Sequence, residues 1–182
     1  EGMTAYTLTS AYGYPPVTMT GSVEKDIMMI TPMIGVKVAV SDHRSSNPTG
    51  EDLIALATAA RRAGLLSNTP GLVTMHMGSG KGRLNPIFYV LDNSDVSPKN
   101  LLPTHMLRSP ELIEDGVELV RRGGYIDCTV GCTPEEMEEA VFTGGGNADP
   151  QNIPHHRAPN PEDILFAQGK NMVFFGCQHQ HD

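Results

Sequence analysis

Apolar runs and amphipathic stretches alternate along most of this chain. Five apolar runs predict β-strands: Thr4–Thr9, Ile34–Val40, Gly71–His76, Leu101–His105 and Tyr125–Val130. Apolar residues at helical spacing predict helices between and after them: Ser22–Ile30, Thr49–Gly64, Ile87–Leu91, Ser109–Gly123 and Thr133–Val141. This alternation predicts a parallel sheet with right-handed crossovers, either doubly wound or part of a (β/α)8 barrel.

Two of the predicted helices carry clear boundary signals. Thr49 and Asp52 have the spacing of a capping box, and the apolar pattern that follows them stops before Gly64. Ser109 followed by Pro110 is typical of a helix start, because proline is tolerated at the first helical position. The sequence therefore predicts both the presence of these two helices and the residues at which they begin.

The chain is shorter than a complete barrel. Its 182 residues compare with roughly 250 in a typical (β/α)8 barrel, and the pattern contains about five strands. We therefore expect an α/β fold that is a partial TIM-type barrel with parallel strands, whose central part is formed by residues 1–143. Glycine- and proline-rich sequence predicts that residues 144–182 are a divergent, loop-rich tail, with one apolar strand at Met172–Phe175.

Composition narrows the choice of partners and compartment. A net charge of −8 and a pI near 5.3 argue against binding to nucleic acid or to an anionic membrane surface. No apolar stretch reaches the roughly 18 residues needed to span a bilayer. The three cysteines form no even disulfide framework, which suggests a reducing compartment, so we expect a soluble, cytoplasmic protein without a membrane or nucleic-acid partner.

Lys37 is the first candidate for chemistry because it interrupts an apolar run. A strand buried on both faces would strip water from its ammonium group, and burial favours the neutral amine. A neutral amine can add to carbon dioxide, and the resulting carbamate can bridge metal ions. The alternative is that Lys37 lies near a strand end and extends its ammonium group into water.

Two histidines lie at similar places in the pattern. His76 ends one predicted strand and His105 ends the next, and both follow Lys37 at intervals of roughly 30 to 40 residues, the length of a βα unit. In parallel α/β folds the strand ends meet at one edge, where active sites form. Imidazole is a common zinc ligand, although either histidine alone is more often a hydrogen-bonded structural residue.

Several strings resemble one known family. They are Gly21–Asp26 (Gly-Ser-Val-Glu-Lys-Asp), Ser41–Ser45 (Ser-Asp-His-Arg-Ser), His76–Gly78, and Leu101–His105 followed by Arg108. In unbroken order over roughly residues 4–130, the chain resembles isoaspartyl dipeptidases, the metal-dependent peptidases of the amidohydrolase superfamily. The resemblance implies a (β/α)8 barrel, two zinc ions, and hydrolysis of β-aspartyl (isoaspartyl) dipeptides by a metal-activated water.

The same resemblance implies roles for individual residues. Carbamylated Lys37 would bridge the two zinc ions, and His76 and His105 would be ligands of one of them. Tyr12 would be the catalytic residue that stabilises charge developing on the oxygen of the scissile carbonyl.

The resemblance also implies which residues bind the substrate and whether the protein forms oligomers. Arg44 and Arg108 would bind a carboxylate of a small dipeptide substrate, a role that suits a planar guanidinium. The family tends to form homo-oligomers, so a homo-oligomer is possible here too.

The sequence departs from the family pattern in two places. No His-x-His pair precedes Lys37, since the only such pair is His179-Gln180-His181, and no late aspartate has the Ser-Asp-Gly context. We therefore expect at most a partial metal site, in a fragment or divergent member of the family. Two alternatives stay open: another amidohydrolase such as a cyclic amide hydrolase, and a catalytically inactive barrel fragment that acts as an interaction or assembly subunit.

Overall fold

Strands and helices alternate throughout the part of the chain that the computed structural model describes, which is residues 5–127 and 172–173. The elements are β1 (Thr7–Thr9), α1 (Val23–Met29), β2 (Met33–Val40), α2 (Gly50–Ser67), β3 (Leu72–Met77), α3 (Asn85–Asn93), β4 (Leu101–Thr104), α4 (Pro110–Arg121), β5 (Ile126–Asp127) and β6 (Met172–Val173). Two short 3-10 turns, η1 (Pro98–Asn100) and η2 (Met106–Arg108), flank β4.

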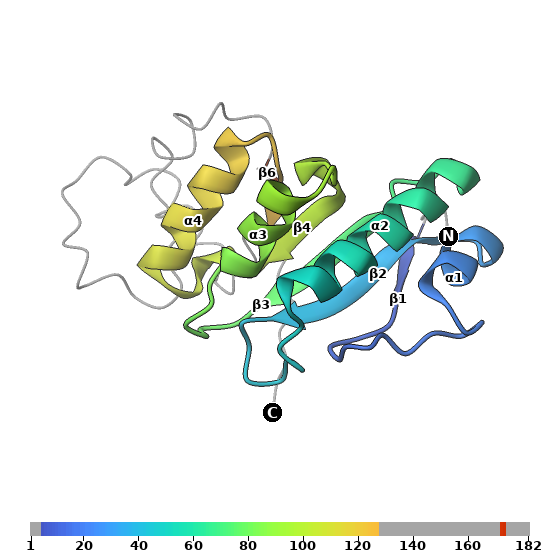
Figure 1. Ribbon diagram of the computed structural model, residues 1–182, viewed down its shortest axis with the longest axis horizontal. Helices are drawn as coiled ribbons and strands as arrows, with labels where there is room; N and C mark the ends of the chain where they lie inside the picture. Colours follow the sequence, from blue (N-terminus) through green and yellow to red (C-terminus); the bar gives the residue numbers. More distant parts are fainter. Residues whose placement is uncertain (1–4, 128–171, 174–182) are drawn as a thin grey trace.

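The main sheet has four strands, all parallel, in the order β1-β2-β3-β4 (Figure 1). The order follows the chain without reversing, which is how strands succeed one another in a (β/α)8 barrel, whereas a doubly wound sheet reverses at a switch point. β5 and β6 form a separate parallel pair. The expected α/β fold with parallel strands is confirmed, and its topology is compatible with a partial barrel.

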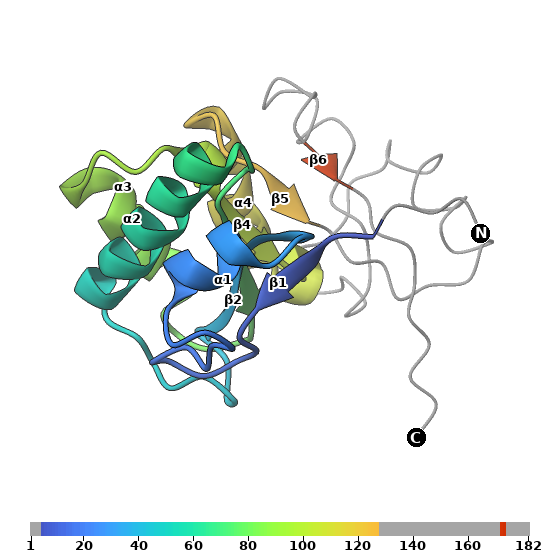
Figure 2. The same ribbon diagram turned by 90° about the vertical axis from the view of Figure 1, so that its right-hand side faces the viewer.

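The helices cover one face of this sheet (Figures 1 and 2), because successive right-handed crossovers in one direction place every helix on the same side. Alternate residues of the strands point toward them and form the core. In β2 and β3 these are Val36, Val38, Val40, Val73, Met75 and Met77, each at most 1% exposed. The residues between them face the other side of the sheet, and these include Lys37 and His76.

The helix signals in the sequence are mostly confirmed. The hydroxyl of Thr49 accepts from the Asp52 N–H, and the Asp52 carboxylate accepts from the Thr49 N–H, so the capping box is complete. The predicted stop at Gly64 is wrong, because α2 continues for one more turn to a left-handed Asn68. Gly64 is needed for packing instead: a Cβ there would lie 2.7 Å from the backbone of Gly71.

A buried carboxylate joins α1 to β1. Asp26 is fully buried and accepts hydrogen bonds from the Thr9 hydroxyl and from the hydroxyl and N–H of Thr20, the latter at 2.6 and 2.8 Å. The Met19 N–H donates to it as well, at 3.0 Å. Burial raises the pKa of this carboxyl, but these hydrogen bonds to the ionised form outweigh it and leave the pKa below its ordinary value.

Several predictions fall wholly or partly outside the described residues. They concern the helix at Thr133–Val141, the cysteines and the loop-rich tail, of which the structure describes only the Met172–Val173 strand. The predicted strand Tyr125–Val130 is present as β5 within the described part. Among the described helices, none combines the length and apolar character that a bilayer span requires.

Candidate functional site

The candidate residues gather at the carboxyl ends of β2, β3 and β4. Backbone pairing places His76 of β3 beside Ala39 of β2 and Thr104 of β4. Lys37 precedes Ala39 by two residues, so it lies on the same face of the sheet as His76 and one pleat deeper. His105 follows directly after β4. The sheet therefore brings residues distant in sequence to one edge, on the face opposite the helices.

The two imidazoles are in contact. The ring centroids of His76 and His105 lie 4.3 Å apart at an interplanar angle of 66°. His76 is only 4% exposed, and His105 is half-buried. His105 has a left-handed backbone, with φ 64° and ψ 40°, which is uncommon for a residue other than glycine and turns the chain sharply from β4 into η2.

Both imidazoles are uncharged at neutral pH. Burial, followed by the neighbouring His105, Arg108 and Arg44, lowers the pKa of His76 to about 4. Burial also lowers the pKa of His105 to about 4, together with the charges of Arg108, Lys37 and Arg44. Neutral imidazole is the charge state that binds metal ions, so both rings have the charge state of a metal ligand at pH 7.

The two ring nitrogens of His76 have different surroundings. Nε2 lies 2.5 Å from Nη2 of Arg44 and 3.3 Å from Nη2 of Arg108. Because a guanidinium group only donates, Nε2 must accept, and the neutral ring then carries its proton on Nδ1. Nδ1 is buried and has no hydrogen-bond partner among the described residues. A buried, unpartnered ring nitrogen is unusual, since buried polar atoms are normally paired.

The ring of Tyr12 lies close to the side chains of both Lys37 and Arg44. Nζ of Lys37 is 5.1 Å and Cζ of Arg44 is 4.9 Å from its centroid, and the ring meets the His76 ring edge to face at 5.0 Å. The loop after β1 holds Tyr12 in place, because its carbonyl accepts a hydrogen bond of 2.9 Å from the Ala39 N–H. Lys37 is thus half-buried beside an aromatic ring.

The expectation that the run around Lys37 is buried on both faces is confirmed for most of β2, since Ala39, on the face opposite the helices, is fully buried as well. Lys37 lies on that same face and keeps some exposure.

Sequence reasoning missed Asp42. Its side chain is fully buried, two residues after the end of β2, and it accepts hydrogen bonds from Nε and Nη2 of Arg44 at 2.9 and 3.2 Å. Oδ2 also lies 3.5 Å from Nε2 of His76 and 3.9 Å from Nη1 of Arg108. The hydrogen bond from Arg44 holds the pKa of this carboxyl well below its usual range. The signal that was available is a carboxylate directly after a buried strand, the same position that drew attention to His76.

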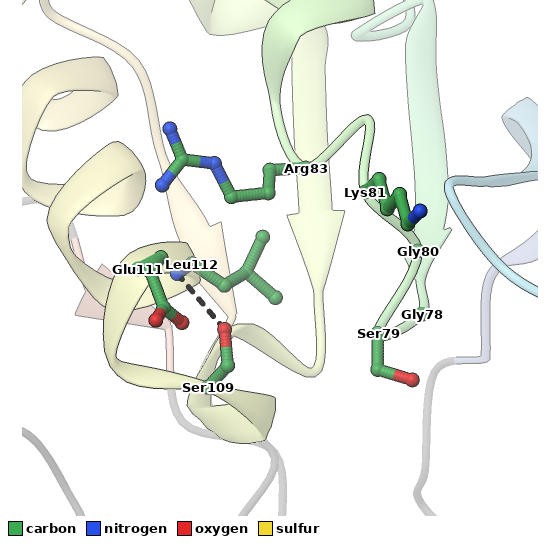
Figure 3. Close-up of a pocket in the computed structure, with 8 residues that line it drawn as sticks. All are labelled: Gly78, Ser79, Gly80, Lys81, Arg83, Ser109, Glu111 and Leu112. Atoms are coloured by element: carbon green, nitrogen blue, oxygen red, sulfur yellow. Dashed lines mark hydrogen bonds between the residues drawn. The ribbon is translucent and has the colours of Figure 1, made fainter. Parts of the chain in front are cut away.

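The structure also contains a cavity of about 210 Å³, whose lining includes none of the six candidate residues (Figure 3). The loop that follows β3 forms one side of it, and the start of α4 forms the other. Its lining consists of Gly78, Ser79, Gly80, Lys81, Arg83, Ser109, Glu111 and Leu112. The loop lies close against Ser41, because a Cβ at Gly80 would be 2.4 Å from the Ser41 carbonyl oxygen.

All six candidate residues are therefore joined by contacts in the structure. Lys37 and Arg44 contact Tyr12, Arg44 and Arg108 contact His76, and His76 contacts His105. Within residues 5–127, however, no group of three or more histidine, cysteine, aspartate or glutamate side chains is arranged to hold a metal ion.

Comparison with known proteins points to one kind of enzyme. No family model matches the sequence. The structure is similar to two crystal structures of β-aspartyl dipeptidase from Fervidobacterium islandicum AW-1, one of them in complex with the dipeptide β-Asp-Leu. For each, the sequence identity is 33%, the TM-score is 0.73 and the match covers 93% of this chain. The chain spans only 41% and 42% of the length of those two chains.

Proposed function

We propose that this chain is part of a metal-dependent hydrolase of the β-aspartyl dipeptidase type. The observation that carries the proposal is the contact between two neutral imidazoles, His76 and His105, at the ends of neighbouring parallel strands. Similarity to the two dipeptidase structures supports it over most of the chain. Because the chain spans about two-fifths of those proteins, activity of the chain by itself is a separate question.

His76 and His105 are the residues that would hold zinc. The unpartnered Nδ1 of His76 fits a metal ligand, because a metal ion would satisfy an atom that is otherwise buried without a partner. Binding zinc through Nδ1 would require the ring proton to move to Nε2, where it would face Oδ2 of Asp42 at 3.5 Å in place of the donors of Arg44 and Arg108. Zinc bound there would polarise a substrate carbonyl. With two imidazoles present, we propose a partial site.

Arg44 and Arg108 are suited to bind a substrate carboxylate. Both side chains are partly exposed, at 42% and 36%, and both donate toward the same nitrogen of His76. Among the described residues, the two guanidinium groups form ion pairs with one buried carboxylate, Asp42, which leaves a surplus of positive charge there. An anionic dipeptide such as a β-aspartyl compound would neutralise that surplus.

Tyr12 and Lys37 complete the proposed site. The ring of Tyr12 lies beside both His76 and Arg44, so its hydroxyl is a candidate donor to the oxygen of a bound carbonyl. Lys37, with Nζ 5.1 Å from the centroid of the same ring, is the proposed position of a carbamate. We propose that the cavity between the loop after β3 and the start of α4 gives room for the second residue of the dipeptide.

Zinc uptake and dipeptide binding test the proposal. The purified chain and its Lys37→Ala variant would be dialysed against zinc, analysed for bound metal, and titrated with β-aspartyl-leucine. We expect zinc and dipeptide binding by the parent chain and weaker zinc binding by Lys37→Ala. Lys25→Ala, at an exposed lysine of α1, is the matched control and should behave as the parent. Zinc uptake by neither protein would reject the proposal.

An assembly subunit without turnover is the second candidate. It is favoured by the lack of a cluster of three histidine, cysteine or acidic ligands within the described part of the chain. Measurement of β-aspartyl-leucine hydrolysis on the same samples separates the two candidates. A stable stoichiometric complex with another protein, without hydrolysis, would favour the subunit.

A further inference from the structure

Asp42 occupies a position that tolerates little change. Its side chain has no solvent exposure, although it follows the end of β2 in a loop. The glycine loop after β3 closes over it, since a Cβ added at Gly78 would lie 2.4 Å from Cα of Asp42. A buried carboxylate is costly unless it is paired and hydrogen-bonded, so this residue must gain its stability from specific partners.

Arg44 is the first of these partners and is held at three points. Its backbone N–H donates to Oδ1 of Asp42 at 2.8 Å, and its Nε donates to the same oxygen at 2.9 Å. Its Nη2 donates to Oδ2 at 3.2 Å. Two donors of one guanidinium group on two oxygens of one carboxylate fix the plane of the arginine as well as its distance.

The same carboxylate also sets where the second arginine lies. Oδ2 of Asp42 is 3.9 Å from Nη1 of Arg108, while Nη2 of Arg108 is 3.3 Å from Nε2 of His76. Nη2 of Arg44 contacts that same ring nitrogen, at 2.5 Å. Two like-charged guanidinium groups therefore converge on one imidazole, an arrangement that their mutual repulsion opposes. The negative charge of Asp42 lies between them and offsets that repulsion.

Arg44 and Arg108 have N–H donors that Asp42 does not use. A guanidinium group has five N–H donors, and both side chains keep about two-fifths of their surface open to solvent, at 42% and 36%. An arginine fork held in this way is oriented before a ligand arrives, which reduces the side-chain ordering that binding would otherwise require.

We infer that Asp42 is the positioning residue that holds Arg44 and Arg108 together as a clamp for a carboxylate of the substrate. The inference rests on the proposed function, because it assigns the ligand of the clamp to the dipeptide. Asp42 acts through the arginines and does not itself touch the substrate. Removing its charge should therefore weaken carboxylate binding through the loss of arginine orientation.

Calorimetric titration of the chain with β-aspartyl-leucine, in the presence of zinc, tests the inference. We expect Asp42→Asn to raise the Kd by about tenfold or more, the effect of losing a charge-assisted hydrogen bond. Arg44→Ala should weaken binding comparably, and the double variant should lose less than the sum of the two single losses, because part of the effect of Asp42 acts through Arg44. Additive losses in the double variant, or a parent-like Kd for Asp42→Asn, would overturn the inference.

A spectroscopic measurement keeps the test valid if a variant is unstable or if no dipeptide binds. The Nε–H resonance of Arg44 in a nitrogen–proton correlation spectrum reports its hydrogen bond to Asp42 directly. It should be sharp and protected from exchange in the parent chain and lose that protection in Asp42→Asn, with Asp42→Glu restoring part of it. An unchanged Arg44 resonance in Asp42→Asn contradicts the inference. A parent chain that binds neither zinc nor dipeptide contradicts the proposed function, and the spectrum then decides the role of Asp42 by itself.

Discussion

The imidazole rings of His76 and His105 meet edge to face with their centroids 4.3 Å apart, at the ends of two neighbouring parallel strands. Each ring removes the other from water, and burial is the largest cause of the low pKa of both. Two neutral imidazoles that share one edge of a sheet are suited to share one metal ion.

Replacing either ring should therefore weaken zinc binding. We expect His76→Ala and His105→Ala each to lower zinc affinity by about tenfold or more, because each removes one nitrogen ligand. Equilibrium dialysis with a competing chelator measures the affinity. His43→Ala is the control, since its side chain is 81% exposed and should contribute nothing. Equal affinity in all three variants would show that zinc binds elsewhere.

The same histidines should make stability depend on pH. Their pKa is about 4 in the fold and 6.5 in the unfolded chain, so the unfolded chain takes up protons first as the pH falls. The free energy of unfolding of the metal-free chain should thus be highest above about pH 6.5 and decrease toward about pH 4. Urea denaturation at a series of pH values measures this. In the double variant His76→Gln, His105→Gln, the decrease should be smaller, and an identical decrease would count against the assignment.

Asp26 should matter for stability and not for the site. Asp26→Asn replaces a buried acceptor of four hydrogen bonds, so we expect a loss of about 1–3 kcal/mol in the free energy of unfolding. Because its pKa is lowered in the fold, the stabilisation is present above the ordinary carboxyl pKa and is lost in acid. Glu24→Gln on the same helix breaks only an exposed ion pair with Arg62 and should cost less than about 1 kcal/mol. Equal losses in the two variants would contradict this account of α1.

A larger residue in the glycine-rich loop after β3 should displace Asp42. In Gly78→Ala the new methyl group meets Cα of Asp42 at 2.4 Å, so either the loop or Asp42 must move. We expect a loss of about 1–3 kcal/mol in stability and a shifted Arg44 Nε–H resonance. Gly13→Ala meets only the Ser46 hydroxyl, at the ordinary distance of 3.6 Å, and should change neither quantity. A Gly78→Ala protein with the parent's stability and spectrum would exclude this coupling.

The strand-end positions could be read from the sequence because two simple periods act together. Alternation along a strand decides which face a side chain takes, and the βα repeat decides which strand ends become neighbours. The βα spacing predicted that Lys37, His76 and His105 lie at the tips of successive strands. This holds for His76 and His105, whereas Lys37 lies inside β2, two residues before the position paired with His76 and on the same face. The helix starts at Thr49 and Ser109 were equally local signals and are confirmed.

What the sequence could not provide were features that arise from contacts between distant elements. Gly64 reads as a helix stop, yet it is required because Gly71 packs against α2. Asp42 lies in the Ser-Asp-His-Arg-Ser string but had no predicted role, because its role depends on which residues contact it: Arg44 from its own loop, His76 from β3 and Arg108 from η2. The family resemblance suggested a role for Arg44 and Arg108, whereas only the structure shows that both contact the carboxylate of Asp42.

Anomalous diffraction from zinc-soaked crystals of the chain, recorded at the zinc absorption edge, tests the central claim most directly. The account predicts a peak within bonding distance, about 2.0–2.1 Å, of Nδ1 of His76 and of a ring nitrogen of His105. It is contradicted if the zinc peaks lie only at other histidines, such as His155 and His156 or His179 and His181, while the His76 and His105 rings remain without metal.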